Sequence, residues 1–262
     1  MSSVKIKLLR IDVSTGKAEK IVDCVAEEKP LHILINRVHY ATIMCSPSNL
    51  KELTIGHLLA EGLLKSVDEI EEISLRETSI CHVRLKKKVD AEKRLKSFKS
   101  FSRVIFSACG NRQPYQFSGM LRKVQSNISV KAETLLNCVN RLNSDAETFR
   151  KTGGVHVASI CKNDGGLVAL AEDVGRHNAV DKVVGRAALM KVDLSGCFLV
   201  LSGRLSGDIV FKAAKVDIPI VASIAAALDS GIAIAKKTRL TLVGFVRGKR
   251  MNVYTCPERV SV

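Results

Sequence analysis

The sequence predicts a mixed α/β protein (α/β or α+β class), and three features of the chain lead to that prediction. Short strand-like runs alternate with helix-length segments from Gly153 onward, which is typical of βαβ units in a sheet with parallel strand pairs. Apolar and polar residues alternate over 4–45 as they do in half-buried strands. A length of 262 residues with 46% hydrophobic side chains suits one large domain, or one domain with a smaller appendage.

The strand-rich N-terminal part is expected to span residues 1–110. After the early strands, Ser48 is expected to cap a helix that runs to about Leu64, because apolar residues recur there at helical spacing. A strand that begins at Ser102 then ends at Cys109, directly before Gly110.

Residues 111–152 are predicted to form a helical connection. One helix is expected around residues 130–143. A second should open at Ser144, where Glu147 three residues later completes a capping box.

Residues 153–262 are predicted to form the α/β domain that binds the ligand. We expect strands at 155–160, 167–171, 198–201, 219–223, 240–246 and 251–255, most of them separated by helices. Ligands in such sheets bind beyond the carboxyl ends of the strands. The polar, glycine-bearing loops should therefore converge on one site, and they are 172–178, 202–208, 223–230 and 245–250.

The composition favours an anionic partner. There are 41 basic and 26 acidic residues, a net charge of +15, which attracts nucleotides, nucleic acid or anionic lipid. No apolar stretch approaches the roughly 18 residues of a membrane helix, and the N-terminus lacks a secretory core, so we expect no membrane contact and a cytoplasmic location. The eight cysteines are scattered singly, so no zinc ribbon is indicated.

Two loops carry the chemistry of phosphate binding. Ser202-Gly203-Arg204 leads into a helix, whose free backbone N–H groups and nearby guanidinium suit an anion; the alternative is a plain tight turn. Phe245 to Arg250 places three cations around Gly248 beside an aromatic ring, and the alternative is an exposed β-hairpin with solvated cations.

The segment from Glu172 to Asn178 is dense in polar side chains for a simple connection. Asp173 or Asn178 would cap the next helix in a structural role. His177 would recognise the ligand or donate a proton, unless it is merely hydrogen-bonded. His156, in an alternating strand, is expected in the core or behind the site.

Cys109 is the candidate nucleophile. It ends a strand and has Arg103 and Arg112 near it in sequence, and cations lower a thiol pKa and raise its thiolate fraction. A buried structural cysteine is the alternative.

Several long strings carry a family resemblance. They are Gly153-Gly-Val-His, Glu172-Asp-Val-Gly-Arg-His-Asn-Ala-Val-Asp-Lys, Ser202-Gly-Arg-Leu-Ser, Ile218-Pro-Ile-Val-Ala-Ser and Gly244-Phe-Val-Arg-Gly-Lys-Arg-Met-Asn-Val-Tyr, with a looser match at Leu53-Thr-Ile-Gly-His-Leu-Leu-Ala-Glu-Gly-Leu. Through them the chain resembles the FdhD/NarQ family of formate dehydrogenase accessory proteins.

The resemblance implies a cytidine-deaminase-like mixed sheet and a sulfur carrier or sulfurtransferase role. Such a protein takes persulfide sulfur from a cysteine desulfurase on Cys109. It passes the sulfur to a molybdenum (or tungsten) bis-molybdopterin guanine dinucleotide bound for the formate dehydrogenase apoenzyme. A homodimer is also implied. The residues expected to bind this cofactor are Asp173, Arg176, His177, Ser202, Gly203, Arg204, Ser223, Phe245, Val246, Arg247, Gly248, Lys249 and Arg250.

One departure from the family pattern keeps a second interpretation open. The family commonly shows Cys-Gly-x-Cys-Gly, whereas here Arg112 stands in place of the second cysteine. A single thiol still carries a persulfide, but a step that needs two cysteines is lost. The alternative is therefore a chaperone that binds the guanine dinucleotide without moving sulfur.

Two other classes are weaker. A zinc nucleobase deaminase needs His-x-Glu and Pro-Cys-x-x-Cys, and neither string occurs. A nucleic-acid binder would use the basic run at 84–103, but only Phe98 and Phe101 could stack on bases there. Nucleic acid is therefore not the expected partner.

Overall fold

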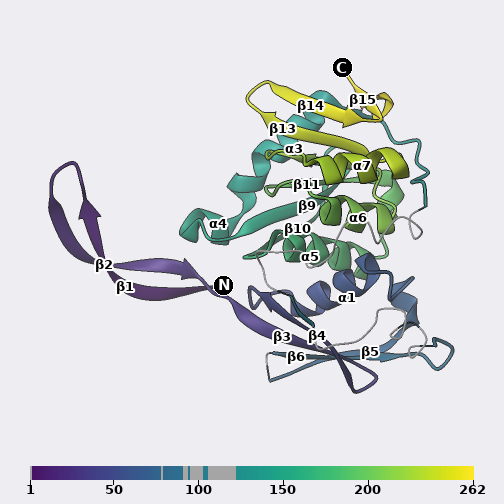
Figure 1. The fold of residues 1–262 in the computed structure, drawn as a ribbon, viewed down its shortest axis with the longest axis horizontal. Coiled ribbons are helices and arrows are strands. Elements are labelled where there is room, and N and C mark those ends of the chain that lie inside the picture. Colours follow the sequence, from purple (N-terminus) through teal and green to yellow (C-terminus); the bar gives the residue numbers. More distant parts are fainter. Residues whose placement is uncertain (1, 78, 91–93, 95–102, 106–121) are drawn as a thin grey trace.

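The computed structural model describes residues 2–77, 79–90, 94, 103–105 and 122–262. It shows a projecting hairpin, an N-terminal sheet covered by a helix, and a larger C-terminal sheet with helices on both faces (Figure 1). The predicted mixed α/β class is confirmed. Within the described ranges, no helix is both long and apolar enough to cross a membrane. Cys109 and the boundary predicted after residue 110 lie outside the described residues.

The hairpin consists of β1 (Ser3–Asp12) and β2 (Lys17–Ala26), paired antiparallel along their full length. Its turn is held by Asp12, whose Oδ1 accepts hydrogen bonds from the Ser14 backbone N–H at 2.8 Å and from the Thr15 N–H at 3.2 Å. The hairpin extends away from the body of the molecule (Figure 1). It exposes apolar side chains such as Ile11 and Val22, so it forms an arm outside both sheets.

The N-terminal sheet has the order β5-β6-β3-β4-β7. Its strands are β3 (Lys29–Ile35), β4 (Val38–Cys45), β5 (Ile70–Arg76), β6 (Ile80–Leu85) and β7 (Arg103–Ile105), and a 3₁₀ turn (Val67–Glu69) precedes β5. Alternate residues of β3 are fully buried, as expected of a sheet with one covered face. Helix α1 (Leu50–Ala60) covers that face and completes the core.

Both predicted ends of α1 are wrong. The residue before the helix is Asn49, in a left-handed conformation without a side-chain cap, while the Ser48 hydroxyl instead lies 3.5 Å from the Lys182 ammonium. The helix stops at Ala60 because Gly62 takes a positive φ of 78° and the chain turns back, with the Leu64 N–H bonded to the Leu58 carbonyl.

The C-terminal sheet has the order β10-β9-β11-β12-β13-β14, and its central pairs β11–β12 and β12–β13 are parallel. Its strands are β9 (His156–Lys162), β10 (Leu167–Asp173), β11 (Cys197–Leu201), β12 (Ile220–Ser223), β13 (Thr241–Arg247) and β14 (Arg250–Thr255). A short parallel pair joins β8 (Val130–Lys131) to β15 (Val260–Ser261), and 3₁₀ turns span Leu194–Gly196 and Pro257–Arg259.

Helices α5 (Arg176–Leu189), α6 (Gly207–Lys215) and α7 (Asp229–Thr238) cover one face of this sheet, and α3 (Ala132–Asp145) covers the other. The alternation along β11 shows this arrangement. Leu199 and Leu201 belong to the cluster under α5–α7, whereas Phe198 and Val200 belong to the cluster under α3. A strand buried on both sides reads as a continuous apolar run, and all of β11 is buried.

The capping box predicted at Ser144 is also wrong. Helix α4 (Glu147–Thr152) begins after Ala146, and the Ser144 hydroxyl donates to the Arg141 carbonyl at 2.9 Å instead. The backbone N–H groups of Thr148 and Phe149 donate hydrogen bonds to the carboxylate of Glu172, at 3.0 and 2.7 Å. A carboxylate from the end of β10 therefore caps α4 across a tertiary contact.

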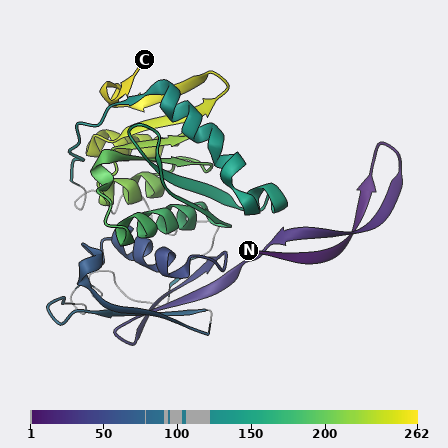
Figure 2. The same ribbon diagram turned by 180° about the vertical axis from the view of Figure 1, so that it is seen from behind.

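The two sheets meet where α1 lies along α5, as both views show (Figures 1 and 2). The helices touch through two glycines. A Cβ at Gly56 would overlap the carbonyl oxygen of Asp181, and a Cβ at Gly185 would overlap the carbonyl oxygen of Glu52. Only residues without a side chain allow this backbone contact.

Candidate functional site

One edge of the C-terminal sheet gathers the loops that the sequence singled out. The carboxyl ends of β10, β11, β12 and β13 lie there, together with the amino end of β9, because β9 runs antiparallel to both of its neighbours. Hydrogen bonds tie the loops together. The Leu205 N–H bonds to the Ala226 carbonyl at 2.9 Å, and the Phe245 N–H bonds to the Ala225 carbonyl at 3.0 Å. The predicted convergence of these loops is confirmed.

Two serines fix the centre of this edge. The Ser202 hydroxyl accepts the Val157 N–H at 3.0 Å and lies 3.2 Å from Nδ1 of His156. Ser223 is fully buried, and its hydroxyl contacts the carbonyl oxygens of Leu201 and Gly203 at 2.9 and 2.6 Å. Ser223 therefore shapes the loop, while the half-buried Ser202 remains near the surface.

Arg176 and Arg204 bring positive charge to the same place. A Cβ on Gly203 would lie 2.9 Å from the Cβ of Arg176, so the arginine side chain lies directly over the glycine. Burial lowers the pKa of His156, and the charges of Arg176 and Arg204 lower it further. The two guanidinium groups thus disfavour protonation of His156 and attract an anion to this edge of the sheet.

The hairpin formed by β13 and β14 adds an aromatic ring and three exposed cations. Phe245 has a φ of 52°, a conformation that is strained for an aromatic residue, and it lies in a bulge where the pairing with β14 shifts. The Arg247 guanidinium lies 5.0 Å from the centre of the Phe245 ring, within cation–π range.

The hairpin predicted as the alternative at this point is present, with Gly248 at φ 62° in its turn. Arg247, Lys249 and Arg250 are exposed on it. Val246 is fully buried in the core under α3, so its side chain cannot reach a ligand at the surface.

Two buried polar atoms at the helix starts have no hydrogen-bond partner among the described residues: Nε2 of His177 and the hydroxyl of Ser206. His177 lies in the first turn of α5, and Ser206 directly precedes α6. Such orphaned atoms are costly unless a ligand or water pairs with them. Burial lowers the pKa of His177 to about 3, with Arg176 and Lys212 contributing, so this imidazole is neutral at physiological pH.

Asp173 and Asn178 are buried and bond to each other in the core rather than facing the loops. Asp173 is fully buried and pairs at 2.6 Å with the ammonium group of the fully buried Lys182. The Asp173 carboxylate also accepts the Ser46 N–H at 3.1 Å and the Asn178 amide at 2.9 Å. Burial raises the pKa of the Asp173 carboxyl, against the opposing effect of Lys182. This pair joins the C-terminal sheet to the end of β4.

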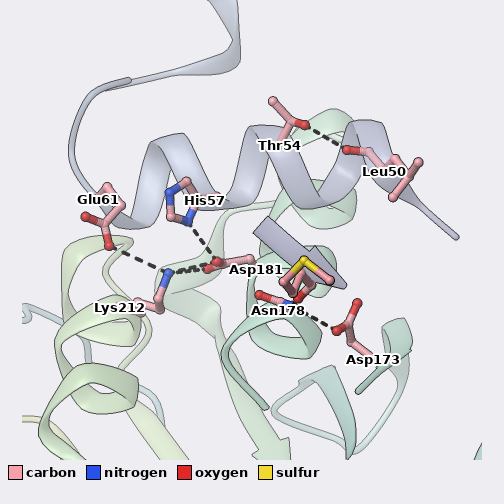
Figure 3. Close-up of polar contacts among 9 residues, drawn as sticks. Leu50, Thr54, His57, Glu61, Asp173, Asn178, Asp181 and Lys212 are labelled. Carbon is pink, nitrogen blue, oxygen red and sulfur yellow. Dashed lines mark hydrogen bonds and ion pairs between the residues drawn. The ribbon is translucent and has the colours of Figure 1, made fainter. Parts of the chain in front are cut away.

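A second buried network joins α1, α5 and α6 (Figure 3). Asp181 on α5 receives the Lys212 ammonium of α6 at 2.7 and 2.8 Å and lies 3.2 Å from Nδ1 of His57 on α1. Burial alone would raise the pKa of Asp181, but Lys212 and His57 outweigh it and the pKa is lowered. The network fixes the three helices relative to one another, and thereby the helix starts at the site.

Sequence reasoning missed Ser206 and the two buried lysines. Ser206 stands in the string Ser202-Gly-Arg-Leu-Ser, so its place between a strand and a helix was an available signal. Lys182 ends the string Glu172-Asp-Val-Gly-Arg-His-Asn-Ala-Val-Asp-Lys, but its pairing with Asp173 depends on the fold. Lys212 had no such signal, because its partner Asp181 lies 31 positions away in the chain.

The donor set fits a phosphate-bearing ligand better than a neutral one. Backbone N–H groups at two helix starts, two arginines, a neutral imidazole and a serine hydroxyl all lie at the carboxyl-end edge, and each can donate to anionic oxygens. Phe245 offers a ring near them.

Known proteins match this chain along nearly its whole length. The FdhD/NarQ family profile matches residues 26–261. A protein from Shouchella clausii named "Sulfur carrier protein FdhD" is 37% identical over 253 residues, 94% of this chain and 93% of that protein. One of the same name from Sulfolobus acidocaldarius is 37% identical over 261 residues, 98% of each chain. A crystal structure from Desulfotalea psychrophila, described as a formate dehydrogenase accessory protein, covers 100% of both chains with a TM-score of 0.81 at 27% identity.

Proposed function

Because the chain belongs to the FdhD/NarQ family, we propose that it is a sulfur carrier for formate dehydrogenase. In this proposal Cys109 takes persulfide sulfur from a cysteine desulfurase. The carboxyl-end edge of the C-terminal sheet holds the acceptor, a molybdenum (or tungsten) bis-molybdopterin guanine dinucleotide that the protein handles as cargo.

The observation that carries the binding half of the proposal is the pair of orphaned buried atoms, His177 Nε2 and the Ser206 hydroxyl, beside the glycine loop crossed by Arg176. Unpaired groups at helix N-termini next to guanidinium groups are what a diphosphate would satisfy. A ligand that hydrogen-bonds to these two atoms offsets the free-energy cost of burying them unpaired.

Each part of the edge has a task in binding. Arg204 and Arg247 would fork onto phosphate oxygens, and the loop N–H groups would donate hydrogen bonds to the remaining oxygens. Phe245, held in its strained conformation by the bulge, presents a ring on which a guanine can stack. Neutral His177 can donate one hydrogen bond without adding charge. Ser223 and Asp173 act indirectly, by holding the loops in place.

The sulfur step on this chain is a thiol exchange. The Cys109 thiolate attacks the terminal sulfur of the desulfurase persulfide, the desulfurase thiolate leaves, and a Cys109 persulfide forms without net oxidation or reduction. Arg112, three residues after Cys109 in the chain, would favour the thiolate form of Cys109. The partners in this proposal are a cysteine desulfurase and the formate dehydrogenase apoenzyme, in the cytoplasm, with the carrier acting as a homodimer.

A second function is favoured by one sequence feature. Arg112 replaces the second cysteine of the family pattern, and the binding edge does not depend on either thiol. A chaperone that binds the guanine dinucleotide without moving sulfur would use the same edge and leave Cys109 unmodified.

Binding of guanosine diphosphate, measured by titration calorimetry, tests the site. We expect Arg204→Ala and Arg247→Ala each to weaken binding about tenfold, the loss of one charge-assisted contact. The matched control is Arg84→Ala, an exposed arginine of the N-terminal sheet paired with Glu72, which should bind as the parent does. Equal affinity in all four proteins would contradict the assignment of the edge.

A further inference from the structure

Three histidines lie on the face of the N-terminal sheet that α1 does not cover. His32 on β3 alternates with residues that are fully buried under α1, so its ring points to the opposite face. Leu34 points the same way, and it pairs with His39 of β4 on one side and with His82 of β6 on the other. Residues that are directly opposite in a strand pair share a face of the sheet, so the three imidazoles lie on one surface.

Two of these imidazoles meet at one hydroxyl group. Nδ1 of His32 lies 2.9 Å from Oγ1 of Thr42, the residue directly opposite it on β4. Nε2 of His39 lies 3.1 Å from the same oxygen, and the centres of the two rings are 6.2 Å apart. Two nitrogen atoms and one oxygen atom from two strands therefore converge on one point of the surface.

A β-bulge makes this convergence possible. His39 and Thr42 are three residues apart in the chain, and in a regular strand such residues point to opposite faces. The pairing of β3 with β4 shifts between Ile33 and Leu34, where β4 holds one residue more than β3. Such an extra residue re-aims the side chains beside it, and here it turns His39 to the face of Thr42.

The spacing of the three donor atoms suits a metal ion. Imidazole nitrogen binds Zn²⁺ at about 2.0–2.1 Å, and at that bond length neighbouring ligand atoms of an octahedral ion are about 3.0 Å apart. The two nitrogen–oxygen distances of 2.9 and 3.1 Å match that separation. In the described parts of the chain, no group of three or more His, Cys, Asp and Glu side chains is arranged to hold a metal, so water would complete the coordination sphere.

We infer that His32, His39 and Thr42 form an open site for a late first-row divalent metal ion, of the class of Ni²⁺, Cu²⁺ and Zn²⁺. Imidazole ligands select these ions over Mg²⁺ and Ca²⁺, which prefer oxygen ligands. His39 is exposed and the other two side chains are half-buried, so an ion reaches them from solvent. Each coordinating ring nitrogen must be free of its proton, and the bound ion ties β3 to β4 across their open face.

Titration calorimetry with Ni²⁺, on the full chain without a polyhistidine tag, tests the site. We expect a single saturable binding event with the parent protein. His32→Asn and His39→Asn should each weaken binding about 10–100-fold, since even the outer-shell partners of metal ligands are worth that much. The matched control is His82→Asn, on the same face but on the strand at the other side of β3, and it should bind as the parent does. No saturable binding by the parent, or an equal loss with His82→Asn, would overturn the inference.

NMR spectroscopy of the parent protein locates the ion without any substitution. Ni²⁺ is paramagnetic and broadens the signals of nuclei close to it. The imidazole signals of His32 and His39 should broaden at the lowest Ni²⁺ additions, before those of His156 and His177 in the C-terminal part. Acid should restore them, because protons compete with the metal for the ring nitrogens. Broadening that begins at His156 or His177, or that is equal at all four residues, would show adventitious binding only and would overturn the site.

Discussion

Gly185→Ala should prevent stable folding or lower the free energy of unfolding by about 4 kcal/mol or more. Losses of that size are exceptional and come from a few mechanisms, and forced atomic overlap in the core is one of them. The new Cβ would overlap the carbonyl oxygen of Glu52 on α1. A backbone atom cannot rotate away as a side chain can, so the two helices must separate. That separation also pulls His57 away from Asp181 and weakens the join between the two sheets.

Denaturant unfolding of the parent and two variants measures the effect. The matched control is Gly196→Ala, since a Cβ there meets nothing within 4 Å and should change stability by less than about 1 kcal/mol. If Gly185→Ala and Gly196→Ala unfold at the same denaturant concentration, the close helix contact does not hold the two sheets together.

Lys182→Met should cost about 3–5 kcal/mol of stability, the range for removing one partner of a buried ion pair. Lys182 and Asp173 are both fully buried and 2.6 Å apart, so the substitution leaves a carboxylate without its counter-ion. The double variant Lys182→Met with Asp173→Asn removes the stranded charge and should recover part of the loss.

The pH dependence of this variant has a definite sign. Without Lys182 the folded-state pKa of Asp173, already raised by burial, rises further above its unfolded value. The folded state then binds more protons than the unfolded state, so the stability of Lys182→Met should increase as pH falls through that folded pKa. Unfolding curves at neutral and mildly acidic pH check this, and a deficit that does not shrink with acid would contradict the burial of an unpaired Asp173 carboxylate.

The order of the C-terminal elements could be predicted because it follows from local periodicity. A run such as Phe198–Leu201 is apolar throughout, and only a strand covered on both faces suits it. Once the strands are placed, the convergence of their polar loops follows from the parallel pairing alone.

What could not be predicted depends on contacts between distant residues. Glu172 caps α4 by accepting the N–H of Thr148, 24 positions earlier in the chain, which made the local signal at Ser144 misleading. Asp173 was expected at the ligand or as a cap, yet its main partner is the buried Lys182. Local sequence gives no sign that a lysine amid valines will meet a carboxylate in the core.

The sequence predicts which residues lie at the binding edge better than it predicts what each of them does there. Arg204 and the cations of the β13–β14 hairpin lie at the expected edge, and their role in binding stays a prediction. Val246 was included through the family string, and its side chain belongs to the core. Ser206 was passed over, although its hydroxyl is one of the unpaired atoms that a ligand would satisfy.

Sulfur loading of Cys109 is the most direct test of the proposed carrier role. The intact mass of the protein would be measured after incubation with a cysteine desulfurase and cysteine, beside Cys109→Ala and the matched control Cys197→Ala. The account predicts a reducible gain of about one sulfur atom on the parent and on Cys197→Ala, and none on Cys109→Ala. No gain on the parent would leave the chaperone function as the better one, and an equal gain on Cys109→Ala would contradict Cys109 as the carrier.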